Sequence, residues 1–136
     1  MQLQPYLYFG GRCEEAIEFY KKTIGASVEN LMHFNESPQP CPEGAIPKDW
    51  GHKVMHATLR FGDSMMMASD GCETMPKFGG FAISLTVAND LEAKRVFSAL
   101  GDGGKICMPL GKTFFASSFG MVTDRFGVPW MVVVLA

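Results

Sequence analysis

This chain of 136 residues has no large excess of acidic or basic residues, no long apolar run and no closely spaced cysteines. Its 12 basic and 14 acidic residues leave a net charge of −2, which argues against binding to nucleic acid. No run approaches the roughly 20 apolar residues that span a bilayer, so we expect no membrane segment. The N-terminus lacks the charged start, apolar middle and small-residue cleavage site of a signal peptide, which predicts a cytoplasmic protein.

No two of the four cysteines form a Cys-x-x-Cys pair. Together with a cytoplasmic location, this spacing favours reduced thiols over a disulfide framework or a zinc knot. Cys13 falls on an apolar helical stripe and is predicted to lie in the core. Cys41 and Cys72 fall in polar segments where a thiol could react, although nothing in the sequence positions a base beside either.

What the chain does have is a strand–turn–helix pattern. Residues 3–9 are aromatic or aliphatic except for Gln4, Gly10 and Gly11 interrupt them, and residues 13–24 carry apolar side chains at every third or fourth position. Gly25 is placed to end this helix.

The same pattern occurs a second time. Residues 81–87 form the second predicted strand, and Asn89 with Glu92 three residues later predicts the start of a helix that ends at Gly101. The apolar stripe of this helix consists of Leu91, Ala93, Val96, Phe97 and Leu100.

Each helix is followed by three predicted strands, at residues 26–34, 53–61 and 64–69 in the first half and 105–110, 115–123 and 128–135 in the second. The fold class is therefore α+β, with two βαβββ units in tandem. We predict a single domain over 1–136, made of repeat units 1–70 and 80–136 with a linker at 71–79. Because a unit of about 60 to 70 residues buries little of its own surface, the two are expected to share a sheet face.

One long segment, residues 35–52, contains four prolines and two glycines, which forbid regular structure. A loop of this length in a small domain is usually functional or disordered. Ile46 and Trp50 give the segment apolar side chains to bury, so we expect a lid or an arm for a partner.

Several of these motifs together resemble one superfamily. The repeated βαβββ order, the Cys-Glu-Glu-Ala-Ile-Glu-Phe-Tyr helix after the Pro-Tyr-Leu-Tyr-Phe strand, and the closing Asp-Arg-Phe-Gly-Val-Pro-Trp-Met resemble the vicinal oxygen chelate superfamily of glyoxalases, bleomycin-resistance proteins and extradiol dioxygenases. Within it the chain is similar to the PhnB-like branch. The resemblance implies that the strands of each half curl into a cup and that units pair across chains in a homodimer. It leaves function open, because one scaffold carries isomerases, dioxygenases, thiol transferases and drug-sequestering proteins.

The resemblance also implies where a divalent metal would be held, with one ligand from the first and one from the last strand of each unit. These positions fall at Pro5, Met66, Ala82 and Met131. Proline and alanine offer no donor atom, and a thioether is a soft ligand that suits Mg, Mn, Fe, Ni or Zn poorly. We therefore expect no metal and no cofactor.

The alternation of side chains along a strand predicts which residues line the cup. If the four expected ligand positions point inward, then Leu7, Ser64, Ala68, Ser84, Thr86 and Val133 do so as well. This lining is apolar with a few hydroxyls, as in many small-molecule pockets, and ten methionines add deformable surface. Trp50 is a candidate rim aromatic. The methionines could equally fill a core left by a lost active site.

All three histidines fall in the first half. His52 and His56 are four residues apart, which on a strand is about 13 Å and too far for one ion. Ordinary surface or core roles are favoured for His33, His52 and His56. His56 is kept as a weak candidate for a general base, because imidazole titrates near neutral pH.

The preferred function is metal-free sequestering or sensing of a small apolar or aromatic molecule, with contacts at Pro5, Leu7, Trp50, Met66, Ala82, Ser84 and Met131. One alternative is a lyase, isomerase or dioxygenase-type enzyme that acts on a small oxygenated substrate through His56 and an unorthodox metal. Another is a degenerate scaffold for protein association. Demethylubiquinone methyltransferase activity is not expected, since the chain has no methyl-donor loop and no doubly wound strand–helix alternation.

Overall fold

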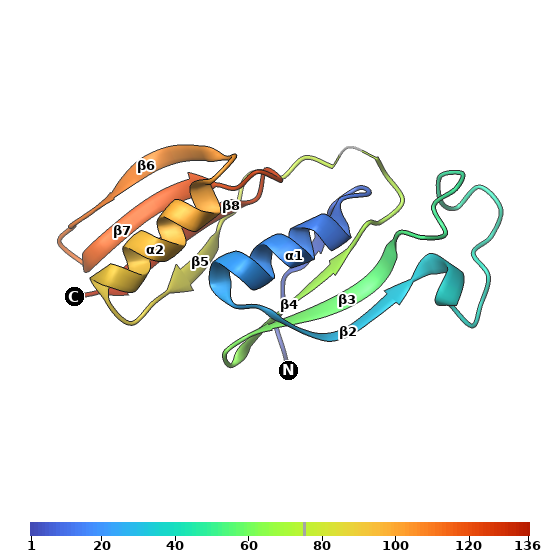
Figure 1. The fold of residues 1–136 in the computed structure, drawn as a ribbon, viewed down its shortest axis with the longest axis horizontal. Helices are drawn as coiled ribbons and strands as arrows, with labels where there is room; N and C mark the ends of the chain where they lie inside the picture. The colour runs from blue at the N-terminus through green and yellow to red at the C-terminus, as the bar shows by residue number, and fades with distance from the viewer. Residues whose placement is uncertain (75) are drawn as a thin grey trace. The chain divides into compact units, whose positions relative to one another are not determined.

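The computed structural model describes residues 1–74 and 76–136, which form two units, Met1–Pro76 and Lys77–Ala136. Each unit contains one four-stranded mixed sheet with one helix lying across it (Figure 1). The order in each is βαβββ, so the α+β fold class expected from the sequence is confirmed. No helix among the described residues is long and apolar enough to cross a membrane.

The first unit has the strand order β1-β4-β3-β2, with β1 parallel to β4 and the other neighbours antiparallel. Its elements are β1 (Tyr6–Tyr8), α1 (Cys13–Ile24), β2 (Ser27–His33), a short 3-10 helix η1 (Phe34–Glu36), β3 (Val54–Phe61) and β4 (Ser64–Ser69). β1 is shorter than the predicted 3–9, and it starts directly after Pro5, whose ring nitrogen has no hydrogen to donate. Residues 37–53 have neither helix nor strand, close to the predicted loop.

α1 begins against a buried carboxylate that lies far away in the sequence. The side chain of Asp70, which follows β4, accepts hydrogen bonds from the backbone N–H groups of Gly11, Cys13 and Val54 at 2.7, 2.8 and 2.8 Å. Three donors and the positive end of the helix dipole compensate the buried charge. Asp70 therefore ties the first turn of α1 to β3 and β4, while Gly25, with φ of 69°, ends the helix as predicted.

The core of the first unit lies between α1 and one face of its sheet. The helix contributes Cys13, Ala16, Ile17, Phe19 and Tyr20, and the sheet contributes Leu7, Ala57, Leu59, Met66 and Ala68. The strand register places Leu7 beside Ala68, and Ala68 beside Ala57, in one row. Since neighbours along a strand point to opposite faces, the alternate residues must point away from α1.

The second unit repeats this plan with the strand order β5-β8-β7-β6. Its elements are β5 (Ile83–Thr86), α2 (Asp90–Gly101), β6 (Lys105–Gly111), β7 (Ala116–Thr123) and β8 (Pro129–Leu135). Asn89 caps α2 as predicted, accepting from the N–H of Glu92 at 2.8 Å. The prediction that Leu91 belongs to the buried stripe is wrong: it lies in the first turn, and 80% of it is exposed.

Candidate functional site

The candidate site is the face of the first sheet that is turned away from α1, which we call the open face. It carries Tyr6 and Tyr8 of β1, His56 and Thr58 of β3, and Met67 of β4. Tyr6 is 38% exposed and Tyr8 is 52% exposed, which is high for large aromatic side chains in a sheet. Two exposed aromatic rings side by side form a surface that can bind a ligand.

Strand geometry explains why these rings meet. Tyr6 and Tyr8 are separated by one residue and therefore lie on the same side of β1, with ring centroids 5.1 Å apart and ring planes at 30°. Tyr6 pairs with Met67, and Met67 pairs with Thr58, which brings β1 close to His56. The centroids of the Tyr6 and His56 rings are 5.5 Å apart. The result is a short aromatic platform beside a methionine.

A chain of hydrogen bonds crosses this platform. The Tyr6 hydroxyl oxygen lies 2.9 Å from His56 Nδ1, and His56 Nε2 lies 3.2 Å from Thr58 Oγ1. Burial raises the pKa of the Tyr6 hydroxyl above its usual range, and the nearby Tyr8 adds to this rise, while a hydrogen bond with Ser69 opposes it. Tyr6 therefore keeps its proton at neutral pH and can act as a hydrogen-bond donor.

The position of Tyr8 depends on one glycine. Gly71 has φ of 65°, and a Cβ atom there would lie 2.8 Å from Tyr8 Cδ1, so a larger residue would displace the ring. The N–H of Gly71 donates to Ser69 Oγ at 2.9 Å. Its carbonyl accepts a hydrogen bond from Trp50 Nε1, also at 2.9 Å. The predicted rim role of Trp50 is wrong, because the ring is only 8% exposed and anchors the end of the long loop.

Three of the predicted cup residues face α1 instead. Leu7, Met66 and Ala68 are only 3%, 2% and 0% exposed and lie in the core under α1. The prediction sets Met66 equivalent to Met131 by matching the Phe-Gly pairs of the two halves. Phe61 ends β3, however, whereas Phe126 lies inside the longer turn between β7 and β8, so the match slips the register by one residue. Such a slip moves every side chain to the opposite face.

The other predicted positions are distributed as follows. Ser84 pairs with Met131 in the second sheet, on the face turned away from α2, with Ser84 exposed and Met131 half-buried. Pro5 is exposed just before β1, and its carbonyl accepts from the N–H of Met67 at 2.9 Å. Ala82 is half-buried just before β5. A ligand contact at any of these residues stays a prediction.

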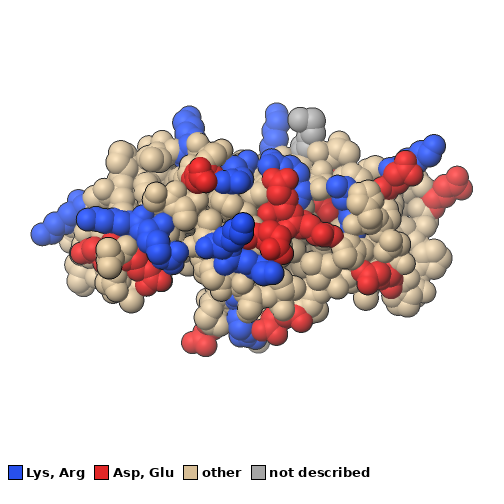
Figure 2. Space-filling view, viewed as in Figure 1, with Lys and Arg blue, Asp and Glu red and all other residues tan. Residues whose placement is uncertain are grey.

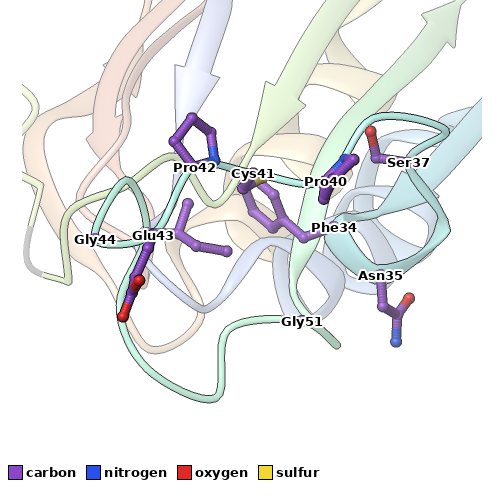
Figure 3. Close-up of a pocket in the computed structure, with 10 residues that line it drawn as sticks. Phe34, Asn35, Ser37, Pro40, Cys41, Pro42, Glu43, Gly44 and Gly51 are labelled. Carbon is purple, nitrogen blue, oxygen red and sulfur yellow. The ribbon is translucent and has the colours of Figure 1, made fainter.

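A second feature of the first unit is a hollow in the long loop. A cavity of about 430 Å³ is lined by Phe34, Asn35, Ser37, Pro40, Cys41, Pro42, Glu43, Gly44, Ile46 and Gly51. In Figure 3 the ring of Phe34 lies beside Cys41, while the carboxylate of Glu43 points away from them. The loop enters this region at η1, where His33 is hydrogen-bonded to both Glu14 and Glu36.

The residues present do not fit the divalent metal that the superfamily resemblance implies. In the part of the chain that the structure describes, no three His, Cys, Asp or Glu side chains are grouped so that they could hold an ion. Both ring nitrogens of His33 already contact carboxylates, and those of His56 contact hydroxyls.

On the face seen in Figure 2, acidic and basic side chains both occur, and large areas carry neither.

Two open four-stranded sheets, each with one helix and arranged as tandem βαβββ units, define the glyoxalase-like fold. The chain belongs to the family described as 3-demethylubiquinone-9 3-methyltransferase, whose sequence model matches residues 1–133. Protein YjdN of Escherichia coli (strain K12) is 38% identical over 143 residues, covering 99% of this chain and 96% of its own.

Solved structures agree with this assignment. Protein PA1353 from Pseudomonas aeruginosa has a TM-score of 0.86 at 44% identity, covering 99% of this chain and 98% of its own. A PhnB protein from Bacillus cereus has a TM-score of 0.80 at 25% identity, covering 98% and 99%. A glyoxalase-related enzyme from Fulvimarina pelagi shares the fold, with a TM-score of 0.58 at 15% identity over 98% and 88% of the two chains. The resemblance to the PhnB-like branch is thereby confirmed.

Proposed function

We propose that the open face of the first sheet binds a small, largely apolar or aromatic molecule, and that the protein sequesters or senses this molecule. The observation that carries the proposal is the stacked and exposed pair Tyr6 and Tyr8, with the Tyr6 hydroxyl held by His56. Small-molecule sites typically combine apolar or aromatic surface with a few oriented polar groups. The open face has both.

The proposal is tested by titrating the protein with indole and following backbone amide signals by NMR. We expect saturable shifts centred on Tyr6, Tyr8 and Thr58. Tyr8→Ala should weaken binding roughly twofold to tenfold, because one aromatic pair contributes about 0.5–1.5 kcal/mol beyond its buried area. Phe114→Ala is the control, since Phe114 is an almost fully exposed aromatic residue in the second unit. Shifts that do not saturate, or an equal effect of both variants, would count against the proposal.

We also propose that the chain forms a homodimer. Supporting this, the edge strand β6 exposes Ile106 and Met108, and Leu135 at the end of β8 is exposed as well. Apolar side chains on an edge strand favour association with another chain. Light scattering coupled to size-exclusion chromatography should give twice the chain mass of 14.9 kDa; a monomer at micromolar concentration would contradict it. A cytoplasmic location stays a prediction.

A second candidate function is acid–base catalysis on a small oxygenated substrate. The hydrogen-bonded series Tyr6, His56 and Thr58 favours it, because a general base needs neighbours that fix its orientation. In that case His56→Ala should abolish turnover while the circular dichroism spectrum shows that the protein is still folded. His52→Ala, an exposed histidine in the same unit, is the matched control.

A further inference from the structure

The protons of the open face can be assigned from hydrogen-bond chemistry. A neutral imidazole has one N–H donor and one nitrogen acceptor, and both nitrogens of His56 have a hydroxyl partner. The Tyr6 phenol is a far stronger acid than the Thr58 alcohol and lies closer, 2.9 Å against 3.2 Å. Tyr6 is therefore the donor to Nδ1, and the N–H of Nε2 is donated to Thr58 Oγ1.

This assignment fixes what Tyr6 can offer a ligand. A phenol has one proton, and here the proton is committed to His56. The part of Tyr6 that remains available is one lone pair on its oxygen, beside the one that the hydrogen bond with Ser69 uses, at the edge of an exposed aromatic platform. A ligand that lies flat on the platform gains a hydrogen bond from Tyr6 only if it brings its own donor.

We propose that the ligand of the open face is a flat aromatic molecule with an N–H or O–H donor at its edge. This inference rests on the proposed function, because it names the ligand class for the same face. A neutral hydrogen bond contributes about 1 kcal/mol net, so the donor should improve affinity roughly fivefold over a ring of the same shape without one.

Protonation of His56 should reverse this preference. An imidazolium donates from both nitrogens, so Tyr6 must then accept from Nδ1, and its own proton becomes available to a ligand acceptor. The neighbours of His56 and Tyr6 on this face are Tyr8 on β1, Met32 on β2, and Met67 and Ser69 on β4, of which only Tyr8 has an ionisable side chain. Arg60, further along the same face of β3, is paired with Glu29. The protonation state of His56 therefore determines whether the open face prefers a ligand with a hydrogen-bond donor or one with an acceptor.

The test compares indole with benzofuran, two rings of nearly the same shape that differ in the N–H. At about pH 8 we expect indole to bind roughly fivefold more tightly. Tyr6→Phe should remove the difference, whereas Tyr8→Phe should keep it, because that substitution retains the ring without touching the Tyr6–His56 bond. Where nitrogen-15 NMR shows that His56 is protonated, the preference should be smaller, and His56→Gln should remove this dependence.

Failure of this inference is distinguishable from failure of the proposed function. If both rings bind with equal affinity and Tyr6→Phe changes nothing, the open face binds aromatic molecules but the donor requirement is wrong. If neither ring binds, the proposed function itself fails. Nitrogen-15 NMR of the histidine side chains gives an independent readout without any ligand: we expect the Nε2–H tautomer for His56, and the Nδ1–H tautomer would overturn the assignment.

Discussion

At the scale of single residues, each unit contains a buried aspartate whose side chain accepts hydrogen bonds from several backbone N–H groups. Asp70 receives three backbone N–H groups, and Asp124 receives those of Phe126 and Val128 together with Trp130 Nε1 at 2.9, 3.0 and 2.9 Å. Neither pattern is visible in the sequence, where Asp70 adjoins the predicted linker and Asp124 falls in a predicted turn. The donors of Asp70 become neighbours only through the strand pairing.

Asp70→Asn should lower the free energy of unfolding by about 3 kcal/mol, because the amide presents an NH₂ group to a backbone donor that is then left unpaired. The measurement is urea denaturation followed by circular dichroism. Asp63→Asn is the control, since Asp63 is exposed in the turn between β3 and β4. Equal midpoints for the two variants would show that the Asp70 carboxylate is dispensable.

The His33 interactions give the molecule a pH dependence. Only an imidazolium can donate to both Glu36 and Glu14, and the hydrogen bond to Glu36, followed by that to Glu14, raises the pKa of His33. When the folded-state pKa is raised, protonation of His33 stabilises the folded protein. This contribution is complete below the unfolded-state pKa of about 6.5 and is lost as the pH rises through the raised folded-state pKa.

The difference in unfolding free energy between wild type and His33→Gln should therefore shrink as the pH rises above the unfolded-state pKa of about 6.5 and through the raised folded-state pKa. It should also shrink in high salt, because these groups are largely exposed and salt screens them. Urea titrations at a series of pH values measure it, with His52→Gln as the control. A difference that grows with pH would contradict the role of His33.

Cysteine reactivity should separate buried from exposed thiols. Burial raises the pKa of the Cys13 thiol far above its usual range, with Asp70 as a further cause, and this side chain is fully buried, as predicted. In the native protein, N-ethylmaleimide should label the exposed Cys72 and Cys107 and leave Cys13 unmodified until urea is added. Peptide mass mapping identifies the sites. Early labelling of Cys13 would mean that α1 detaches readily from its sheet.

At the scale of elements, the helices are the most predictable parts. Apolar spacing, Gly25 and the Asn89–Glu92 cap are local signals, and both helices lie where these signals place them. Sheet register is not local, because it depends on the length of each turn. The two-residue turn after β3 and the longer turn after β7 differ, which is why the Phe-Gly match places Met66 on the wrong face.

The residues of the open face on β1 could have been predicted from the sequence. Tyr6 and Tyr8 flank Leu7, and once Leu7 is placed in the core the alternation of a strand puts both tyrosines on the other face. The partner of His56 is harder to predict, because Tyr6 lies fifty positions away in the sequence and meets it across β4.

Two leucines of α2 offer a matched test of helix burial. Leu100 is fully buried against the sheet, whereas Leu91 is mostly exposed at the first turn. Leu100→Ala should lower the free energy of unfolding by about 2–5 kcal/mol, because it leaves a cavity. Leu91→Ala should change it by less than about 0.5 kcal/mol. Urea denaturation of both variants is sufficient, and equal losses would show that α2 is rotated from the described orientation.

At the scale of the whole molecule, the two units share a plan but differ in chemistry. All three histidines and all three tyrosines lie in the first unit. The corresponding face of the second sheet presents Ser84, Thr86, Met131 and Val133 together with Phe119, which pairs with Val133. The repeat therefore preserves the architecture, while the aromatic side chains that can also exchange a proton are concentrated in one half.

Gly71 links two parts of this first unit that are distant in sequence. The lack of a side chain leaves room for Tyr8, and the carbonyl holds Trp50 at the end of the long loop. Any side chain at position 71 would disturb the aromatic pair and the loop anchor together. The residue at this position is thus a marker that can be read from a gene: in a relative with a bulky residue there, we expect the ring of Tyr8 to be displaced or replaced.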